Sequence, residues 1–203
     1  MKLSKIARIT RKYKALTLIE DGGRQWVLIG QAAYVLDGAP RITSGEELLT
    51  LMDVPADARD GYDVQIIEAG PGWSALLDEA MDADTAARIG DVLIEWGGVL
   101  HVPLIPDDGG DVVWFSELYA APFGDEAVTY ARRVTPDGKP VIAVRRGLSL
   151  IAVLAPREVT PDAWAALEEV CGRGLGSLEL LESPPEDDGR PRQARLDEDG
   201  AEF

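Results

Sequence analysis

The chain has 203 residues, 46% of them hydrophobic, and carries 36 acidic against 20 basic residues for a net charge of −16. Its single cysteine, Cys171, excludes an internal disulfide framework and is typical of a reducing compartment. No run approaches the roughly 18 apolar residues of a membrane span, and residues 1–14 lack the apolar region of a signal peptide. We therefore expect a cytoplasmic protein with no membrane partner.

The charge is unevenly distributed along the chain. Residues 1–19 contain six basic residues and no acid, whereas residues 42–131 contain 19 acids against two arginines. Such a negative field repels phosphate backbones, so direct nucleic-acid binding is not expected and a basic protein surface is the favoured partner. The alternative is that the acids only keep the chain soluble. The N-terminal basic residues are expected to pair with the chain's own acids.

A pattern of turn, apolar run, Pro-Arg, threonine and helix start occurs twice. The first copy begins at Asp21-Gly22-Gly23 and the second at Asp137-Gly138, 116 residues later, and the threonines Thr43 and Thr160 are 117 residues apart. Each copy predicts a β-hairpin, further strand and a capped helix.

The repeat predicts an α+β fold with two related β-hairpin-plus-helix lobes, built from antiparallel or mixed sheets and separated by a helical, acidic middle segment. The lobes are expected over residues 1–55 and 99–182, with strand and helices over 56–98. Residues 183–203 are rich in Asp, Glu, Arg, Gly and Pro, which predicts a disordered acidic tail.

In the first lobe, runs of alternating or apolar residues predict four strands, over residues 6–11, 13–20, 26–29 and 33–36. Asp21-Gly22-Gly23 predicts a tight turn between the second and third of these. Thr43 or Ser44, with Glu46 or Glu47, is expected to form a capping box for a helix over residues 46–52.

The middle segment predicts a loop over residues 56–61, a strand over 62–68 and helices over 73–81 and 84–95, the last of them ended by Gly97-Gly98.

In the second lobe, two hairpins are expected, one pairing residues 99–105 with 112–119 and one pairing 128–134 with 141–145. Pro103 predicts an edge strand or a bulge. The apolar run 148–154 predicts a strand covered on both faces. Thr160 is expected to cap a helix over residues 163–170, followed by a short element over 175–181.

Motifs for nucleophilic catalysis are missing from the sequence. His101 is the only histidine and lies in an apolar, strand-like run, which favours a structural residue. Cys171 follows a predicted helix near Arg173, where a buried small residue is the favoured interpretation. No Gly-x-Ser-x-Gly elbow occurs.

Two other segments have a weak likeness to ligand sites. Asp107-Asp108-Gly109-Gly110-Asp111 contains close carboxylates but lacks the order and the distal glutamate of a calcium loop, and turn geometry explains it. Gly70-Pro71-Gly72 lies where a phosphate cradle would, but it lacks a lysine and has acids around it. We therefore expect no metal and no cofactor.

The favoured function is a non-enzymatic protein-binding module whose acidic face engages a basic partner. A narrower version is a nucleic-acid mimic that inhibits a DNA-handling or defence enzyme. The candidate partner-binding residues are Asp78, Glu79, Asp82, Asp84, Asp91, Glu95, Asp107, Asp108 and Asp111. The alternatives are a structural or assembly scaffold, and an enzyme of unfamiliar fold that uses a carboxylate cluster near residues 107–111 or the loop 70–72.

Overall fold

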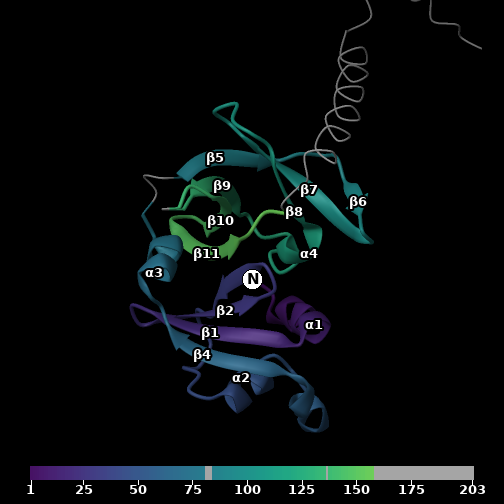
Figure 1. The fold of residues 1–203 in the computed structure, drawn as a ribbon, viewed down its shortest axis with the longest axis vertical. Helices are drawn as coiled ribbons and strands as arrows, with labels where there is room; N and C mark the ends of the chain where they lie inside the picture. Colours follow the sequence, from purple (N-terminus) through teal and green to yellow (C-terminus); the bar gives the residue numbers. More distant parts are fainter. Residues whose placement is uncertain (81–83, 136, 158–203) are drawn as a thin grey trace, which may run out of the picture. The chain divides into compact units, whose positions relative to one another are not determined.

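The strands of the described residues form one mixed, mostly antiparallel sheet of 11 strands (Figure 1). This computed structural model describes residues 1–80, 84–135 and 137–157, all within the unit Met1–Glu158. The order along the sheet is β4-β1-β2-β3-β11-β10-β9-β5-β7-β6. β8 pairs with the side of β7 that faces away from β5 and β6.

The strands are β1 (Ala15–Asp21), β2 (Arg24–Ile29), β3 (Ala32–Val35), β4 (Asp63–Glu68), β5 (Asp84–Ile89), β6 (Ile94–Trp96), β7 (Val99–Pro106), β8 (Val113–Ser116), β9 (Thr129–Val134), β10 (Pro140–Arg146) and β11 (Ser149–Leu154). The described residues also form five short helices: α1 (Leu3–Tyr13), α2 (Gly45–Leu51), the 3-10 helix η1 (Ala56–Gly61), α3 (Pro71–Leu77) and α4 (Glu117–Ala120). α1 contacts β1 and β2, α2 contacts β4, and α4 contacts β7 and β8 (Figure 1).

The two copies of the repeat are two three-stranded meanders, β1-β2-β3 and β9-β10-β11. They do not form two lobes as predicted, because β3 pairs antiparallel with β11, with Ala33 opposite Val153, and joins them into one sheet. Both joining strands are apolar, and all of β3 is buried. Each copy alone would expose an apolar edge strand with unpaired backbone groups, and the other copy satisfies those groups.

The predicted strand over residues 6–11 is instead part of helix α1. Ile6, Ala7, Ile9 and Thr10 are buried, which is the 3–4 spacing of one helix face, and the basic residues lie on the other face. Arg11 and Lys12 are in the last turn, where positive charge is favourable. Ile6 and Ile9 are three residues apart, a spacing that fits one face of a helix but puts the two side chains on opposite faces of a strand, so the strand prediction was wrong.

The predicted helix over residues 84–95 is also wrong, because these residues form β5 and β6. β5 pairs with β9 and β7, and β6 forms a hairpin with β7. Gly97 and Gly98 have φ of 61° and 75°, as the two central residues of a tight hairpin turn require. The Gly-Gly pair is therefore a hairpin turn rather than a helix stop, and the middle segment contains more strand than helix.

Most remaining elements are confirmed. The strands predicted over 13–20, 26–29, 33–36, 62–68 and 148–154 and both hairpins of the second lobe are present, with shifts at their ends. The capping box of α2 is confirmed: Ser44 Oγ accepts from Glu47 N (3.2 Å), and the Glu47 carboxylate accepts from Thr43 N (2.7 Å). The helix predicted over 73–81 ends at Leu77, and the loop predicted over 56–61 is η1.

β7 is not the edge strand that Pro103 predicted, because β8 pairs on one side of it and β5 and β6 on the other. Pro103 O accepts from Gly90 N (2.9 Å), where β5 has ended and β6 has not begun. The missing N–H of Pro103 therefore falls in the gap between two partner strands. The elements predicted over residues 163–170, 175–181 and 183–203 lie outside the described residues.

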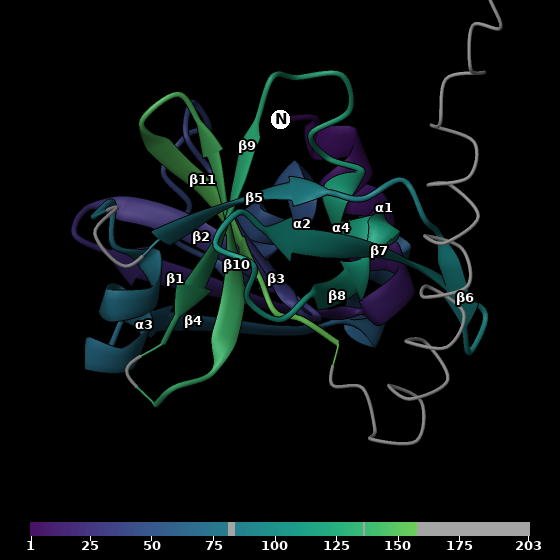
Figure 2. The same cartoon turned by 90° about the horizontal axis from the view of Figure 1, so that it is seen from above.

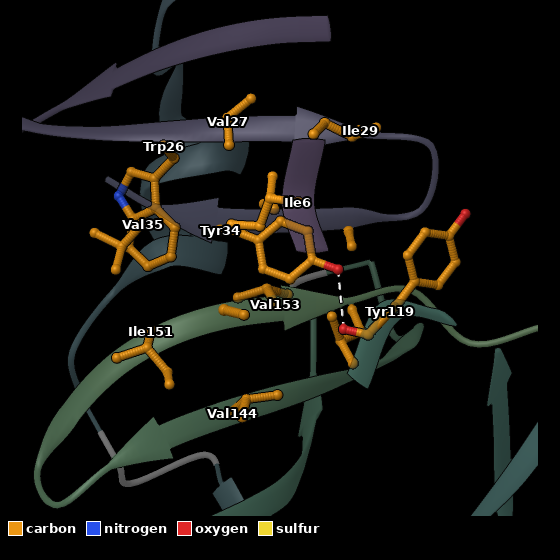
Figure 3. Close-up of a cluster of buried hydrophobic side chains, with 14 of the residues drawn as sticks. Ile6, Trp26, Val27, Ile29, Tyr34, Val35, Tyr119, Val144, Ile151 and Val153 are labelled. Atoms are coloured by element: carbon orange, nitrogen blue, oxygen red, sulfur yellow. Dashed lines mark hydrogen bonds between the residues drawn. The ribbon is translucent and has the colours of Figure 1, made fainter. Parts of the chain in front are cut away.

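One hydrophobic core extends through both copies. Viewed from above, β9, β10 and β11 cross β1 and β4 at a steep angle, which reflects the twist of the sheet (Figure 2). Trp26, Val35, Ile151 and Val153 lie together in this core, and Tyr34 OH donates to Tyr119 O (2.9 Å) (Figure 3). The shared core is a second reason why the copies form a single unit.

Candidate functional site

The candidate acids do not form one continuous site. Asp82 lies outside the described residues. Six of the other acids are exposed but are not gathered at one place on the surface: Asp78, Asp91, Glu95, Asp107, Asp108 and Asp111. Asp91 and Glu95 lie just before and within β6, whereas residues 107–111 form the turn between β7 and β8. Because β5 pairs antiparallel with the end of β7 that precedes this turn, the two groups lie at opposite ends of β5.

Asp84 does not present its carboxylate to a partner, because its side chain is only 4% exposed. Asp84 Oδ1 accepts from Arg133 Nε (2.6 Å), and Asp84 Oδ2 accepts from a terminal nitrogen of Arg145 (2.8 Å). The two arginine side chains are 4% and 3% exposed. A carboxylate held between two buried guanidiniums serves as a structural ion pair.

The same arginines hold the segment that precedes β5. Arg133 donates to the main-chain oxygens of Leu76 (2.8 Å) and Ala80 (2.9 Å), and Arg145 also donates to Ala80 O (3.2 Å). Glu79 accepts from Leu150 N (2.8 Å) on β11 and also pairs with Arg24 and Arg145. We call Asp84, Glu79, Arg133 and Arg145 the arginine clamp, and it holds residues 76–80 and Asp84 against the second meander.

The turn between β7 and β8 has the geometry of an ordinary polar turn. Asp108 Oδ1 accepts from Gly110 N (2.9 Å), and Asp108 Oδ2 accepts from Arg132 (3.0 Å). Asp107 and Asp111 have exposed positions on either side of it. No group of three or more His, Cys, Asp or Glu residues that could hold a metal occurs in the described part of the chain.

An exposed apolar group accompanies two of the acids, and the sequence analysis missed it. Val92, Leu93 and Leu100 are 44%, 53% and 43% exposed. Glu95 lies directly opposite Leu100 across the β6–β7 pair. We call Asp91, Val92, Leu93, Glu95 and Leu100 the β6–β7 surface. The prediction of a helix over residues 84–95 concealed this exposed group, and the hairpin signal of Gly97-Gly98 could have corrected that prediction.

His101 lies in the interior, opposite Ser116 in the β7–β8 pair, and no hydrogen bond between these two side chains is found among the described residues. Its side chain is buried, Nδ1 is 2.9 Å from Val99 O, and its ring is 6.2 Å from that of Trp96. Burial lowers the pKa of His101, an effect larger than that of its hydrogen bonds to the main chain. These contacts support the expected structural histidine. Cys171 lies outside the described residues.

A tyrosine network joins α1 to α4. Tyr119 OH donates to Tyr13 OH (2.7 Å) and accepts from Gln31 N (3.2 Å), and the rings of Tyr13 and Tyr119 stack 6.1 Å apart. Burial raises the pKa of Tyr34 and of Tyr119 well above the ordinary value and that of Tyr130 to about 12. Tyr34, Tyr119 and Tyr130 therefore remain protonated near neutral pH and do not act as bases there, and the hydroxyls of Tyr34 and Tyr119 donate hydrogen bonds.

Few other features suggest a ligand. A cavity of about 170 Å³ is lined by Met1, Val35, Asp37, Arg146 and Ile151, among others, which is small beside the roughly 300–1,000 Å³ of ordinary ligand pockets. Gly70 is the N-cap of α3, Pro71 and Gly72 belong to the helix itself, and the helix has only seven residues. No helix among the described residues is long and apolar enough to span a membrane.

Most of the basic residues in residues 1–19 do not form the expected ion pairs with acids of the described residues. Within residues 1–80, 84–135 and 137–157, Arg11 pairs with Asp53 (3.5 Å), and no ion pair is found for the other five: Lys2, Lys5, Arg8, Lys12 and Lys14. The described acids and bases of the chain thus leave exposed charge of both signs on different elements.

Comparisons with known proteins identify no relative of this chain: no family model, no curated protein and no solved structure matches it.

Proposed function

We propose that this protein is a non-enzymatic protein-binding module that engages a basic partner through its β6–β7 surface. The partner carries lysine or arginine side chains next to apolar ones. The observation that supports the proposal is the pairing of exposed acids with exposed apolar side chains on one hairpin: Asp91 and Glu95 beside Val92, Leu93 and Leu100.

The charges of this surface are available to a partner. Within the described residues, neither Asp91 nor Glu95 takes part in an ion pair, whereas Glu79, Asp84 and Asp108 are bound by arginines. Exposed acids steer a basic partner and raise its association rate. Because Asp91 and Glu95 are also accompanied by the exposed apolar side chains, we assign these two acids, rather than all nine, to the contact.

The apolar side chains supply the affinity that exposed ion pairs do not. An exposed ion pair contributes only about 0–1 kcal/mol, whereas full burial of a leucine side chain is worth about 1.5–3 kcal/mol. Leu93 and Leu100 are each about half exposed, so a partner that covers either of them gains about 1 kcal/mol from it.

The experiment measures binding of a fluorescent amphipathic leucine–lysine helical peptide to the full chain at low and high salt. The variant Asp91→Lys/Glu95→Lys should bind about tenfold more weakly, because each reversal replaces an attraction by a repulsion. The matched control, Asp57→Lys/Asp60→Lys, changes the net charge equally on the exposed part of η1 and should stay within about threefold of the wild type.

Leu93→Ser/Leu100→Ser tests the apolar half of the surface and should weaken binding about tenfold at both salt concentrations. Leu148→Ser, at an 80% exposed leucine on the turn between β10 and β11, is its control. Equal losses in both charge variants would contradict the proposal, since the acids would then act only through net charge.

The nucleic-acid-mimic version is a narrower form of the same proposal. It requires that this protein and duplex DNA compete for one basic DNA-binding protein, so that binding of one prevents binding of the other. The variant Asp91→Lys/Glu95→Lys should then no longer compete with the DNA. Simultaneous binding of both would contradict that version and leave the broader one standing.

A further inference from the structure

β4 is the longest open edge of the sheet in the described part of the chain. It has six residues and pairs only with β1, in parallel. The edge at β6 has three residues and the edge at β8 has four. In β8, the main-chain oxygen of Trp114 already accepts a hydrogen bond from Arg157 N (2.7 Å). An open edge is a template for a further strand.

The hydrogen-bond register shows which backbone groups of β4 face outward. Asp63 N donates to Lys14 O (2.9 Å) and Ala69 N donates to Glu20 O (2.7 Å), so the odd-numbered residues of β4 face β1. Alternate residues of a strand direct their N–H and C=O groups to opposite sides. The N–H and C=O groups of Val64, Ile66 and Glu68 therefore face away from β1. We call these groups the β4 edge.

The side chains around the β4 edge combine one apolar contact with several acids. Ile66 is 43% exposed, and a strand added beside β4 would cover it. Four residues of this region have exposed acidic side chains: Asp57, Asp60, Asp63 and Glu68. The one arginine of the region, Arg59, is already bound to Glu46.

The charge of the β4 edge selects its occupant. Pairing with the same edge of a second copy would bring these acids against each other, which is unfavourable. A strand with basic side chains opposite Asp63 and Glu68 would face them with opposite charge, and an apolar side chain opposite Ile66 would contact it.

We propose that the β4 edge binds an extended basic peptide segment as an additional strand of the sheet. Main-chain hydrogen bonds to Val64, Ile66 and Glu68 hold the peptide, Ile66 receives an apolar side chain, and Asp63 and Glu68 pair with basic side chains. This surface is separate from the β6–β7 surface, and its occupant is a strand rather than a helix.

The test uses the wild-type full chain and, as the probe, a heptapeptide with lysine at its first and sixth positions and valine at the others, so that the two lysines lie opposite Asp63 and Glu68. Amide hydrogen exchange, followed by NMR, should slow about tenfold at Val64, Ile66 and Glu68 when the edge is about nine-tenths occupied, because only bound molecules are protected. The same heptapeptide with N-methyl groups on the residues that would face β4 keeps its charge and side chains but lacks the donors, and it should give no protection there.

Charge reversal in the protein supplies a second measurement. Asp63→Lys/Glu68→Lys should weaken heptapeptide binding about tenfold. Asp91→Lys/Glu95→Lys, with the same change in net charge, should leave it within about threefold. Equal binding of the N-methylated peptide, or protection of residues 94–101 instead of 64–68, would overturn the inference. Both outcomes are independent of whether the β6–β7 surface binds its own partner.

Discussion

Removal of the buried carboxylate of Asp84 should strongly destabilise the protein. Asp84→Asn keeps the shape of the side chain but leaves Arg133 and Arg145, 4% and 3% exposed, without the carboxylate between them. Breaking a buried ion pair by removing one partner costs about 3–5 kcal/mol, because the remaining charge stays buried. Glu79 can offset only part of this, since its side chain is 46% exposed and its contact with Arg145 is 3.7 Å long.

Asp108→Asn is the matched control. Asp108 pairs with one arginine, Arg132, and its side chain is 45% exposed, so the change should cost no more than about 1 kcal/mol. Both variants can be compared by urea unfolding, and in thermal unfolding Asp84→Asn should lower Tm by about 6–20 °C. Equal stabilities of the two variants would refute the reasoning, because the guanidiniums would then have to be solvated or paired elsewhere.

Apolar replacement of the whole cluster should not restore stability. In Asp84→Leu/Arg133→Met/Arg145→Met no charge is left buried, but the main-chain oxygens of Leu76 and Ala80 lose their guanidinium donors. Each buried acceptor left without a donor costs about 1–3 kcal/mol. A triple variant as stable as the wild type would show that these carbonyl contacts contribute little.

Two further predictions concern one backbone position and the single histidine. Gly30→Ala should lower the free energy of unfolding in urea more than Gly147→Ala does. Both glycines have φ near 60° and lie 117 residues apart in the two copies. A Cβ at Gly30 would be 2.6 Å from Tyr119 OH, whereas a Cβ at Gly147 meets nothing within 4 Å. Equal losses would mean that Tyr119 moves aside without cost. Burial lowers the pKa of His101 below its ordinary value of 6.5, so the unfolded chain binds a proton on His101 more readily than the folded chain does. The stabilisation from neutral His101 is therefore complete above pH 6.5 and is lost as the pH falls through 6.5 toward the folded pKa. His101→Asn should therefore lose less stability than the wild type between about pH 7.5 and about pH 5.5, and parallel pH profiles would contradict this.

The candidate site could be predicted only in part, because a list of acids does not say which of them the fold neutralises. Asp84 and Asp91 look alike in the sequence, but strand β5 places Asp84 opposite Arg133 of β9, whereas Asp91 follows the end of β5 and is exposed. Asp84 also accepts a hydrogen bond from Arg145 of β10, 61 residues away in the chain. Which carboxylate is free is therefore a property of strand order and register.

Local signals determined the elements whose chemistry is complete within a few residues. Ser44 and Glu47 form their capping box, and Asp21-Gly22-Gly23 turns β1 into β2, because the groups involved lie within four residues of one another. The same signals revealed the repeat. The period of residues 84–95 was misjudged because it has no strong alternation of its own, and its strands are stabilised by pairing with β7 and β9.

Tertiary structure alone decided how the two copies combine. The sequence showed two similar apolar segments and suggested two lobes, since nothing in either segment states which strand will cover its edge. In the folded chain β3 and β11, separated by more than a hundred residues, pair with each other because each leaves apolar side chains and unpaired backbone groups that the other can cover. The long-range partner, rather than either segment's own pattern, makes the single sheet.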